Sequence, residues 1–327
     1  MELNKQPLLS ICIPTYNRAE ILQKNLILLL QHKNFDENVE IIISDNASTD
    51  NTPTIVNNII KSHPKANIRY SRNKENIKDD NFIKVLALGS GTYLKLLNDY
   101  TNLTEEGLKI MKETIKKYEG ENCNLYFFNS LRSPHSHKKE IYIESIDELV
   151  KTLNNKLTWI SNFGIWKKDL SLLMAKKFNS KLQLLQMMWI LFLQEYKSSV
   201  IINYKEMRNL PVPYTSRSPY NFFTPHIENY YNILEEYKNR GLISQETLSY
   251  DKKRTLSDFP GRKIVEYLIY KEKCNFDLSN SWKIIYNKYG HEKALYILII
   301  KAYLYYPLHI LKKIIPKKYK QFIKKIF

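Results

Sequence analysis

Short apolar runs that alternate with helical patterns constrain the fold of the first hundred residues more than any other feature. Each run is too short for a helix and is closed by polar residues, which is typical of a buried strand. The runs are residues 8–13, 39–43 and 94–97, with a shorter strand expected at 68–70, and the helical patterns are residues 19–30, 54–62 and 81–88. Strands that alternate with helices predict a parallel sheet with right-handed crossovers.

The ends of these strands carry the polar side chains that we expect to bind a ligand. Pro14 and Thr15 follow the first run, Asp45 and Asn46 follow the second, and Asp99 follows the run at 94–97. In an open α/β sheet, ligands bind beyond the carboxyl ends of the strands. A carboxylate there can accept hydrogen bonds from ribose hydroxyls or help to hold a divalent cation. For Asp99, a turn residue that starts the next helix is the alternative.

Glycine-rich phosphate loops are absent from the sequence. Neither the dinucleotide fingerprint nor a GxxxxGK[ST] loop occurs, which excludes the two commonest phosphate-binding solutions. The formal net charge of +17 nevertheless favours an anionic partner, such as a phosphate-bearing small molecule, nucleic acid or an acidic lipid surface. Cys12, Cys123 and Cys274 lie far apart without metal-ligand spacing, which predicts a reducing compartment and no zinc site.

Four blocks of sequence resemble one known family. They are SICIPTYNR at 10–18, IIISDNASTDNT at 41–52, RNKENIKDDNFIKVLALGSGTY at 72–93 and LLNDYTN at 96–102. In order and spacing they resemble the inverting nucleotide-sugar glycosyltransferases of family 2, and within that family the abequosyltransferase-like enzymes of bacterial surface polysaccharides. The resemblance implies a GT-A fold, an α/β architecture with a Rossmann-like, mostly parallel sheet and flanking helices. A helical C-terminal region is expected to follow it.

The resemblance also implies which residues bind the nucleotide. They are Pro14, Thr15, Asn17, Asp45, Asn46, Arg72, Asp80 and Asp99. Asp45 would read the base, and Asn46 would support its loop. Arg72 would face a phosphate, and Asp80 would contact the base or the ribose.

Two departures from the family pattern concern the cation. Lys78 stands where the family usually has glycine, and Asp99-Tyr100-Thr101 stands where it commonly has Asp-x-Asp. The resemblance implies a divalent cation, Mn or Mg, with Asp99 as its ligand, but Thr101 is a poor ligand for a hard dication without help. Three interpretations stay open. Asp99 and the donor's diphosphate hold the cation with water, Lys78 or Arg72 supplies its charge instead, or the site is inactive.

A general base is the residue that the four blocks do not supply. An inverting transferase needs one to deprotonate the acceptor hydroxyl. Residues 182–192 contain no acid or histidine, and Gln186 stands where related enzymes often place a histidine. Asp169 and Glu195 are the nearest acids in the sequence. We select Asp169 as the catalytic base, with capping of the following helix as its alternative role.

The C-terminal part of the chain is expected to be helical from residue 228 onward. The last segment, Leu308 to Phe327, combines seven lysines with aliphatic and aromatic side chains and contains no acid. Such a basic amphipathic tail fits an anionic membrane surface, or else a solvated helix face. The expected domains are a GT-A domain at 1–215, with a nucleotide-binding half at about 1–103 and an acceptor half at about 104–215, a helical region at 216–306 and the tail at 307–327.

Together these features predict an inverting glycosyltransferase that moves a sugar from a nucleotide diphosphate sugar to a lipid-linked or polysaccharide acceptor in cell-surface glycan biosynthesis. The alternative is a catalytically degenerate relative that binds nucleotide sugars or membranes as an assembly protein. Nucleic acid is not an expected partner, because the terminal lysines interleave with aliphatic side chains rather than stacking aromatics. Without a secretory signal or an eighteen-residue apolar run, the expected location is cytoplasmic and peripheral at the inner face of the cell membrane.

Overall fold

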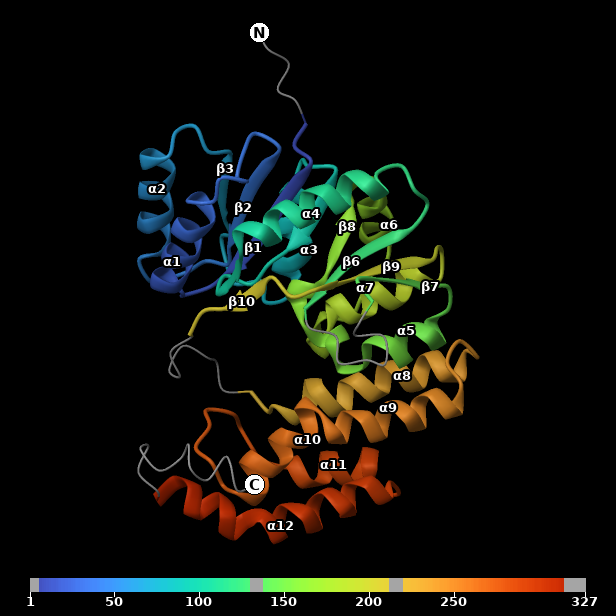
Figure 1. Ribbon diagram of the computed structural model, residues 1–327. Helices are drawn as coiled ribbons and strands as arrows, with labels where there is room; N and C mark the ends of the chain where they lie inside the picture. Colours follow the sequence, from blue (N-terminus) through green and yellow to red (C-terminus); the bar gives the residue numbers. More distant parts are fainter. Residues whose placement is uncertain (1–5, 130–137, 212–219, 315–327) are drawn as a thin grey trace. The chain divides into compact units, whose positions relative to one another are not determined.

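The computed structural model describes residues 6–129, 138–211 and 220–314, and of residues 311–314 only the backbone (Figure 1). Contacts divide the chain into two units. Unit 1 comprises residues 1–217 and 240–243, and unit 2 comprises residues 218–239 and 244–327. The expected boundary at residue 215 falls within residues 212–219, outside the described part of the chain.

A five-stranded, mostly parallel sheet organises the first half of unit 1. Its order is β3-β2-β1-β4-β8, with β1 (Leu9–Thr15), β2 (Val39–Asp45), β3 (Ile68–Arg72) and β4 (Tyr93–Leu96) parallel and β8 (Gly164–Trp166) antiparallel at one edge. The strands are connected through α1 (Ala19–Leu30), α2 (Thr52–Ser62) and α3 (Asp80–Leu88). This arrangement confirms the expected α/β alternation.

Two of these strands run further than the sequence predicted. We expected Pro14 to end the first strand, but β1 continues to Thr15 and β2 to Asp45, so that Thr15 and Asp45 are paired in register. Pro14 lacks a backbone N–H, yet it occupies the second-to-last position of β1, where only one ladder hydrogen bond is at stake. The residues expected in loops are therefore held rigidly by the sheet.

The second half of unit 1 contains two smaller sheets. β6 (Asn124–Asn129), β9 (Ser199–Tyr204) and β7 (Glu140–Ile143) form one in the order β6-β9-β7, and β5 (Thr101–Leu103) pairs with β10 (Met207–Asn209) in the other. The α-helices here are α4 (Glu105–Tyr118), α5 (Ile146–Leu153), α6 (Leu170–Ala175) and α7 (Leu185–Gln194). Short 3₁₀ turns are η1 (Asn154–Thr158), η2 (Ile160–Asn162), η3 (Lys167–Asp169) and η4 (Ser180–Leu182). The core joins aliphatic residues of β1 and β2 to Tyr93, Phe127 and Trp166.

Unit 2 is helical, as expected. It contains α8 (Tyr230–Asn239), α9 (Gln245–Ser257), α10 (Phe259–Lys263), α11 (Ser281–Tyr289) and α12 (Lys293–Ile314), with π-helical turns η6 (Thr224–Asn229) and η7 (Ile264–Ile269). Buried Asp251 accepts hydrogen bonds from the Tyr230 and Tyr231 hydroxyls at 3.1 and 3.0 Å.

The last helix runs into the segment that the sequence assigned to the tail. The tail was expected to begin at residue 307, and α12 includes Pro307 and continues to Ile314. Proline removes one i to i−4 hydrogen bond without preventing a long, exposed helix from continuing beyond it. Most of the expected tail, residues 315–327, lies outside the described residues. Among the described helices, none is both long and apolar enough to cross a membrane.

A buried carboxylate ties together the amino ends of β1, β2 and β4. Glu40 in β2 is 1% exposed and accepts hydrogen bonds from the Ser10 hydroxyl, the Ser90 and Gly91 backbone N–H groups and Arg69. Burial raises the pKa of Glu40, but the bonds from Ser10, Ser90 and Arg69 outweigh it and hold this pKa below the usual 4.5. The ionised form is therefore favoured in the folded state.

We predict that Glu40→Gln lowers the free energy of unfolding at pH 7 by about 1–3 kcal/mol, because a carboxamide cannot accept all of these hydrogen bonds. Since the folded-state pKa is depressed, this stability is present above the unfolded pKa and is lost as pH falls through the folded value. The loss should therefore shrink below about pH 4.5 in denaturant titrations. Exposed Glu37→Gln is the matched control; an equal loss in both variants would contradict the assignment.

Candidate functional site

The carboxyl ends of β1 and β4 meet at Asp99. Asp99 lies three residues beyond the end of β4 and is 3% exposed. Its Oδ2 accepts a hydrogen bond of 2.9 Å from the Thr15 hydroxyl at the end of β1. The structure thus brings together two residues that are 84 positions apart and that the sequence assigned to the same sheet edge.

Arg18 is the second partner of the Asp99 carboxylate, and the sequence pattern did not predict this contact. Its Nη1 lies 2.9 Å from Asp99 Oδ1, and its guanidinium carbon lies 5.4 Å from the centre of the Tyr100 ring. Burial raises the pKa of Asp99, while Arg18 and Thr15 oppose that rise. Arg18 retains 25% side-chain exposure, so a cationic group reaches the surface directly beside the buried carboxylate.

The loop that carries Asp99 is fixed by amide and hydroxyl groups. Asn25 in α1 donates to the backbone carbonyls of Asp99 and Thr101 at 3.1 and 3.0 Å. Thr101 donates its hydroxyl to Asn209 Oδ1 at 2.8 Å, across the β5–β10 pair. Thr101, which replaces the second carboxylate of the family motif, thus supports the loop by a hydrogen bond of its own.

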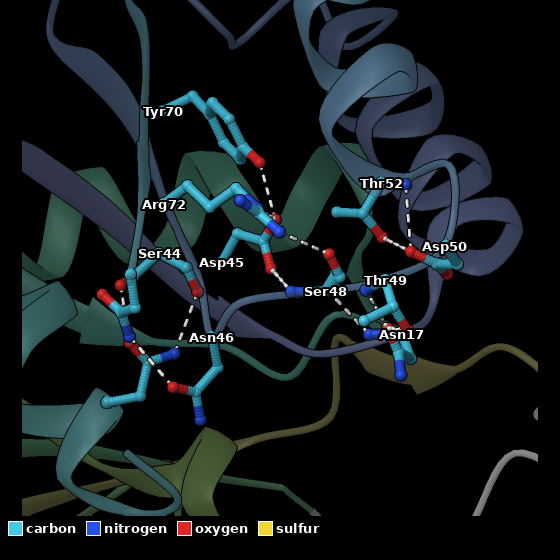
Figure 2. Close-up of polar contacts among 12 residues, drawn as sticks. Asn17, Ser44, Asp45, Asn46, Ser48, Thr49, Asp50, Thr52, Tyr70 and Arg72 are labelled. Atoms are coloured by element: carbon cyan, nitrogen blue, oxygen red, sulfur yellow. Dashed lines mark hydrogen bonds and ion pairs between the residues drawn. The ribbon is translucent and has the colours of Figure 1, made fainter. Parts of the chain in front are cut away.

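Asp45 is enclosed by its own chain (Figure 2). Its carboxylate accepts the Ser48 N–H at 2.8 Å and the Tyr70 hydroxyl at 2.6 Å, and it lies 3.7 Å from Arg72 Nε. Burial, followed by the hydrogen bond to Asp45, raises the pKa of Tyr70. Asp45 is fully buried, so in this conformation it positions Tyr70, Arg72 and the 46–48 loop.

Arg72 is the last residue of β3 and also contacts this loop. Its Nη2 donates to the Ser48 carbonyl at 2.8 Å, and 47% of its side chain is exposed. A half-exposed guanidinium at the carboxyl edge remains accessible to a phosphate.

Asn46 holds the segment that connects β3 to α3. Its Oδ1 accepts from the Asn73 amide and the Ile77 N–H, both at 2.9 Å. Its Nδ2 donates to Asn76 Oδ1 at 2.8 Å and to the Lys78 carbonyl at 3.1 Å. Asn46 thus fixes residues 73–78 to the end of β2, and its role toward a ligand stays a prediction.

Asn17 and Asp50 join the starts of α1 and α2 (Figure 2). Asn17 adopts a left-handed conformation with φ 50°, donates its N–H to the Ser48 hydroxyl at 2.9 Å and accepts the Thr49 N–H at 2.7 Å. Asp50 accepts the Ala19 and Thr52 N–H groups, each at 3.0 Å. These contacts satisfy backbone donors that two helix starts would otherwise leave open.

Lys78, Asp79 and Asp80 lie where α3 begins. Lys78 adopts φ 51°, a left-handed conformation that glycine adopts without steric cost, which accounts for the glycine that the family pattern has at this position. Burial, and then the neighbouring Asp80, raise the pKa of Asp79 to about 6. Asp80 is exposed at the first position of α3.

The structure does not bring Asp169 to this edge. Asp169 follows β8, which runs antiparallel to β4 and pairs Trp166 with Tyr93 at the amino end of that strand. Its carboxylate lies 2.6 Å from Lys197 Nζ, and it makes no side-chain cap to α6. The antiparallel direction of β8 therefore puts Asp169 at the opposite end of the sheet from Asp99.

The described residues at the carboxyl edge of the main sheet offer few ligands for a divalent cation. Within the described residues, no group of three or more His, Cys, Asp or Glu side chains could hold a metal ion. Asp99 is the ligand that the resemblance implied, and both its carboxylate oxygens already have partners, Thr15 and Arg18. A cation here would need further oxygen ligands from a bound substrate.

Comparison with known proteins agrees with the resemblance seen in the sequence. The family model described as glycosyl transferase family 2 matches residues 10–171, which contain all four sequence blocks. Abequosyltransferase RfbV of Salmonella typhimurium is 30% identical over 158 residues, covering 45% of each chain. A GalNAc(5)-diNAcBac-PP-undecaprenol beta-1,3-glucosyltransferase of Campylobacter jejuni is 29% identical over 183 residues, covering 54% of this chain and 56% of the relative. The chain thus spans about half the length of these curated relatives.

Solved structures share the fold over most of the chain. TarS 1–349 of S. aureus aligns with a TM-score of 0.55 at 15% identity, covering 92% of this chain and 91% of that one. The mannosyltransferase PcManGT of Pyrobaculum calidifontis, in complex with GDP-Man and Mn²⁺, aligns with a TM-score of 0.54 at 12% identity, covering 92% and 87%. These neighbours are GT-A glycosyltransferases, which confirms the expected fold class. The family match, the four sequence blocks and the curated relatives agree that residues 10–171 of the chain belong to glycosyl transferase family 2.

Proposed function

We propose that the chain is an inverting glycosyltransferase that transfers a sugar from a nucleotide diphosphate sugar to a glycan or lipid-linked acceptor in cell-surface glycan biosynthesis. The observation that carries this proposal is the contact between Thr15 and Asp99, which joins the first and last family blocks at the carboxyl edge of the sheet. Named relatives support it, since RfbV is an abequosyltransferase and the Campylobacter jejuni relative is a glucosyltransferase.

The charge distribution at this edge supports a diphosphate donor. Arg18 and Arg72 reach the surface with 25% and 47% side-chain exposure, beside the two buried carboxylates Asp99 and Asp45. Guanidinium groups bind phosphate oxygens through paired hydrogen bonds. TarS structures with UDP and with UDP-GlcNAc, and the PcManGT complex with GDP-Man, also support a nucleotide sugar as the donor here.

In the proposed reaction an acceptor hydroxyl attacks the anomeric carbon while the bond to the nucleotide diphosphate breaks on the opposite face, which inverts the configuration. A base takes the hydroxyl proton, and negative charge develops on the leaving diphosphate. Arg18 and Arg72 would stabilise that charge, and the hydrogen bonds that hold both side chains to the chain support this role. Asp169 is at the other end of the sheet and has no part in this mechanism.

We further propose a weak cation site. Asp99 together with the donor's diphosphate would hold Mn²⁺ or Mg²⁺, and the cation would supply positive charge to the leaving group. The Mn²⁺ in the PcManGT complex supports this. Arg18 already neutralises Asp99, so this chain should depend on the cation less than a site with two carboxylates.

The acceptor is proposed to be lipid-linked, as the undecaprenol in the name of the Campylobacter jejuni relative suggests. Such acceptors lie at a membrane, which agrees with the proposed location in the cytoplasm, peripheral at the inner face of the cell membrane, and with the basic segment Leu308 to Phe327.

The test is a thermal-shift panel of nucleoside diphosphates with and without Mn²⁺, followed by transfer from the donor that binds to lipid-linked glycan acceptors. The enzyme proposal is supported if one nucleoside diphosphate stabilises the protein and if the same nucleotide is released from its sugar donor when an acceptor is added. Stabilisation without turnover for any acceptor tried would favour the degenerate binding protein, and no stabilisation at all would sink both.

We predict that Asp99→Asn weakens nucleotide diphosphate binding by about tenfold to a hundredfold, because a carboxamide cannot form the ion pair that fixes Arg18. Isothermal titration calorimetry measures the change. Glu113→Gln, an exposed substitution on α4, serves as the control and should bind normally. Equal affinity of the Asp99 variant and the parent protein would show that this edge is not the nucleotide site.

Arg18 yields a separate prediction about the cation. Arg18→Gln should weaken nucleotide binding in EDTA and should regain at least about tenfold affinity when Mn²⁺ is added, because Asp99 then lacks its cationic partner. Arg18→Lys keeps the charge and should respond to Mn²⁺ as weakly as the parent. Complete loss of nucleotide binding by the parent protein in EDTA would contradict this account.

A further inference from the structure

One face of α12 carries large apolar side chains in contact with solvent. Tyr296, Ile297, Ile300, Tyr303 and Leu304 are 47%, 52%, 58%, 61% and 71% exposed. Their spacing of three and four residues places them along one side of the helix, and Ile310, at 37% exposure, extends the row. We call these six residues the α12 face. An apolar surface of this extent on a helix indicates a binding surface.

The other side of α12 is fixed within unit 2. Leu295 and Ala302 are buried, and the Tyr270 hydroxyl donates to the Ala302 carbonyl at 3.1 Å. The Tyr270 ring packs against Tyr306 with centroids 5.4 Å apart and stacks on His309 at 4.2 Å. The helix is therefore anchored along one side, which leaves the α12 face turned outward as a fixed feature of the fold.

The positive charge around the α12 face favours an anionic partner. From Lys293 to the C-terminus the sequence contains nine lysines and no Asp or Glu, so this segment carries +9 of the total +17. Lys293 and Lys301 are exposed on α12 itself. Apolar side chains flanked by lysines, with tyrosines among them, suit an anionic lipid surface, where the rings lie at headgroup level and the ammonium groups meet phosphates.

We infer that α12 lies in the plane of an anionic membrane, with the α12 face in the headgroup and upper acyl region. This inference rests on the proposed function, because it would hold the enzyme where a lipid-linked acceptor is presented. The contact itself is a property of α12, and it can be measured without donor or acceptor.

The test is co-sedimentation of the full chain with vesicles of phosphatidylglycerol and phosphatidylcholine, compared with vesicles of phosphatidylcholine alone. The parent protein should bind the anionic vesicles and not the neutral ones. The double variant Ile300→Glu and Leu304→Glu should bind the anionic vesicles about tenfold more weakly or worse, since it removes apolar contacts and adds two like charges to the lipid. Met174→Glu, at an equally exposed apolar position on α6, adds the same kind of charge elsewhere and should bind as the parent does.

Three results would overturn the inference. They are equal binding by the double variant and the parent, no binding of the parent to anionic vesicles, and a parent dimer in solution that the double variant converts to a monomer. The third result would assign the α12 face to a second copy of the chain. Thermal shift with the nucleotide identified above separates the two proposals, because the double variant should keep its nucleotide response whether or not it binds vesicles.

Discussion

The carboxyl edge of the main sheet depends on the burial of Asp99. A carboxylate removed from water is costly unless it is paired and hydrogen-bonded, and Asp99 has one such partner on each oxygen, Thr15 and Arg18. Thr15 ends β1, and Arg18 precedes α1, so this single group fixes the end of one strand, the start of one helix and its own loop. The edge is therefore preorganised before a ligand arrives, which is the condition for electrostatic catalysis.

Hydrogen bonds within the chain also fix the rest of the carboxyl edge. Asp45 and Asn46, which the resemblance assigned to ligand binding, direct most of their hydrogen-bonding capacity to their own chain. In the proposed site they would act on a ligand through the groups that they hold, which are Tyr70, Arg72 and the segment before α3. A residue can thus be essential to such a site while being buried, and its substitution would change the position of a neighbour rather than remove a contact.

Much of this fold could be predicted from sequence, because its signals are local. The helices Ala19–Leu30 and Asp80–Leu88 agree with the predicted ranges to within one residue, since their apolar period and end signals are contained in the segment itself. The features that were predicted wrongly or missed depend on contacts between residues that are distant in the sequence. Asp169 was selected by its place in the sequence, but the direction of β8 is set by its pairing with β4. Arg18 was missed because its partner is 81 positions away.

The net positive charge is concentrated at the C-terminal end of the chain, away from the residues of the sheet edge in the sequence. Over half of the net charge of +17 lies after residue 292, in a segment without acids, whereas the carboxylates of the sheet edge are neutralised by arginines beside them. The overall basic character therefore says little about the nucleotide site, where binding depends on a few oriented groups at short range. It describes the sequence of α12 and the residues after it, where the proposed contact with an anionic surface would depend on many lysines together and would be weakened by added salt.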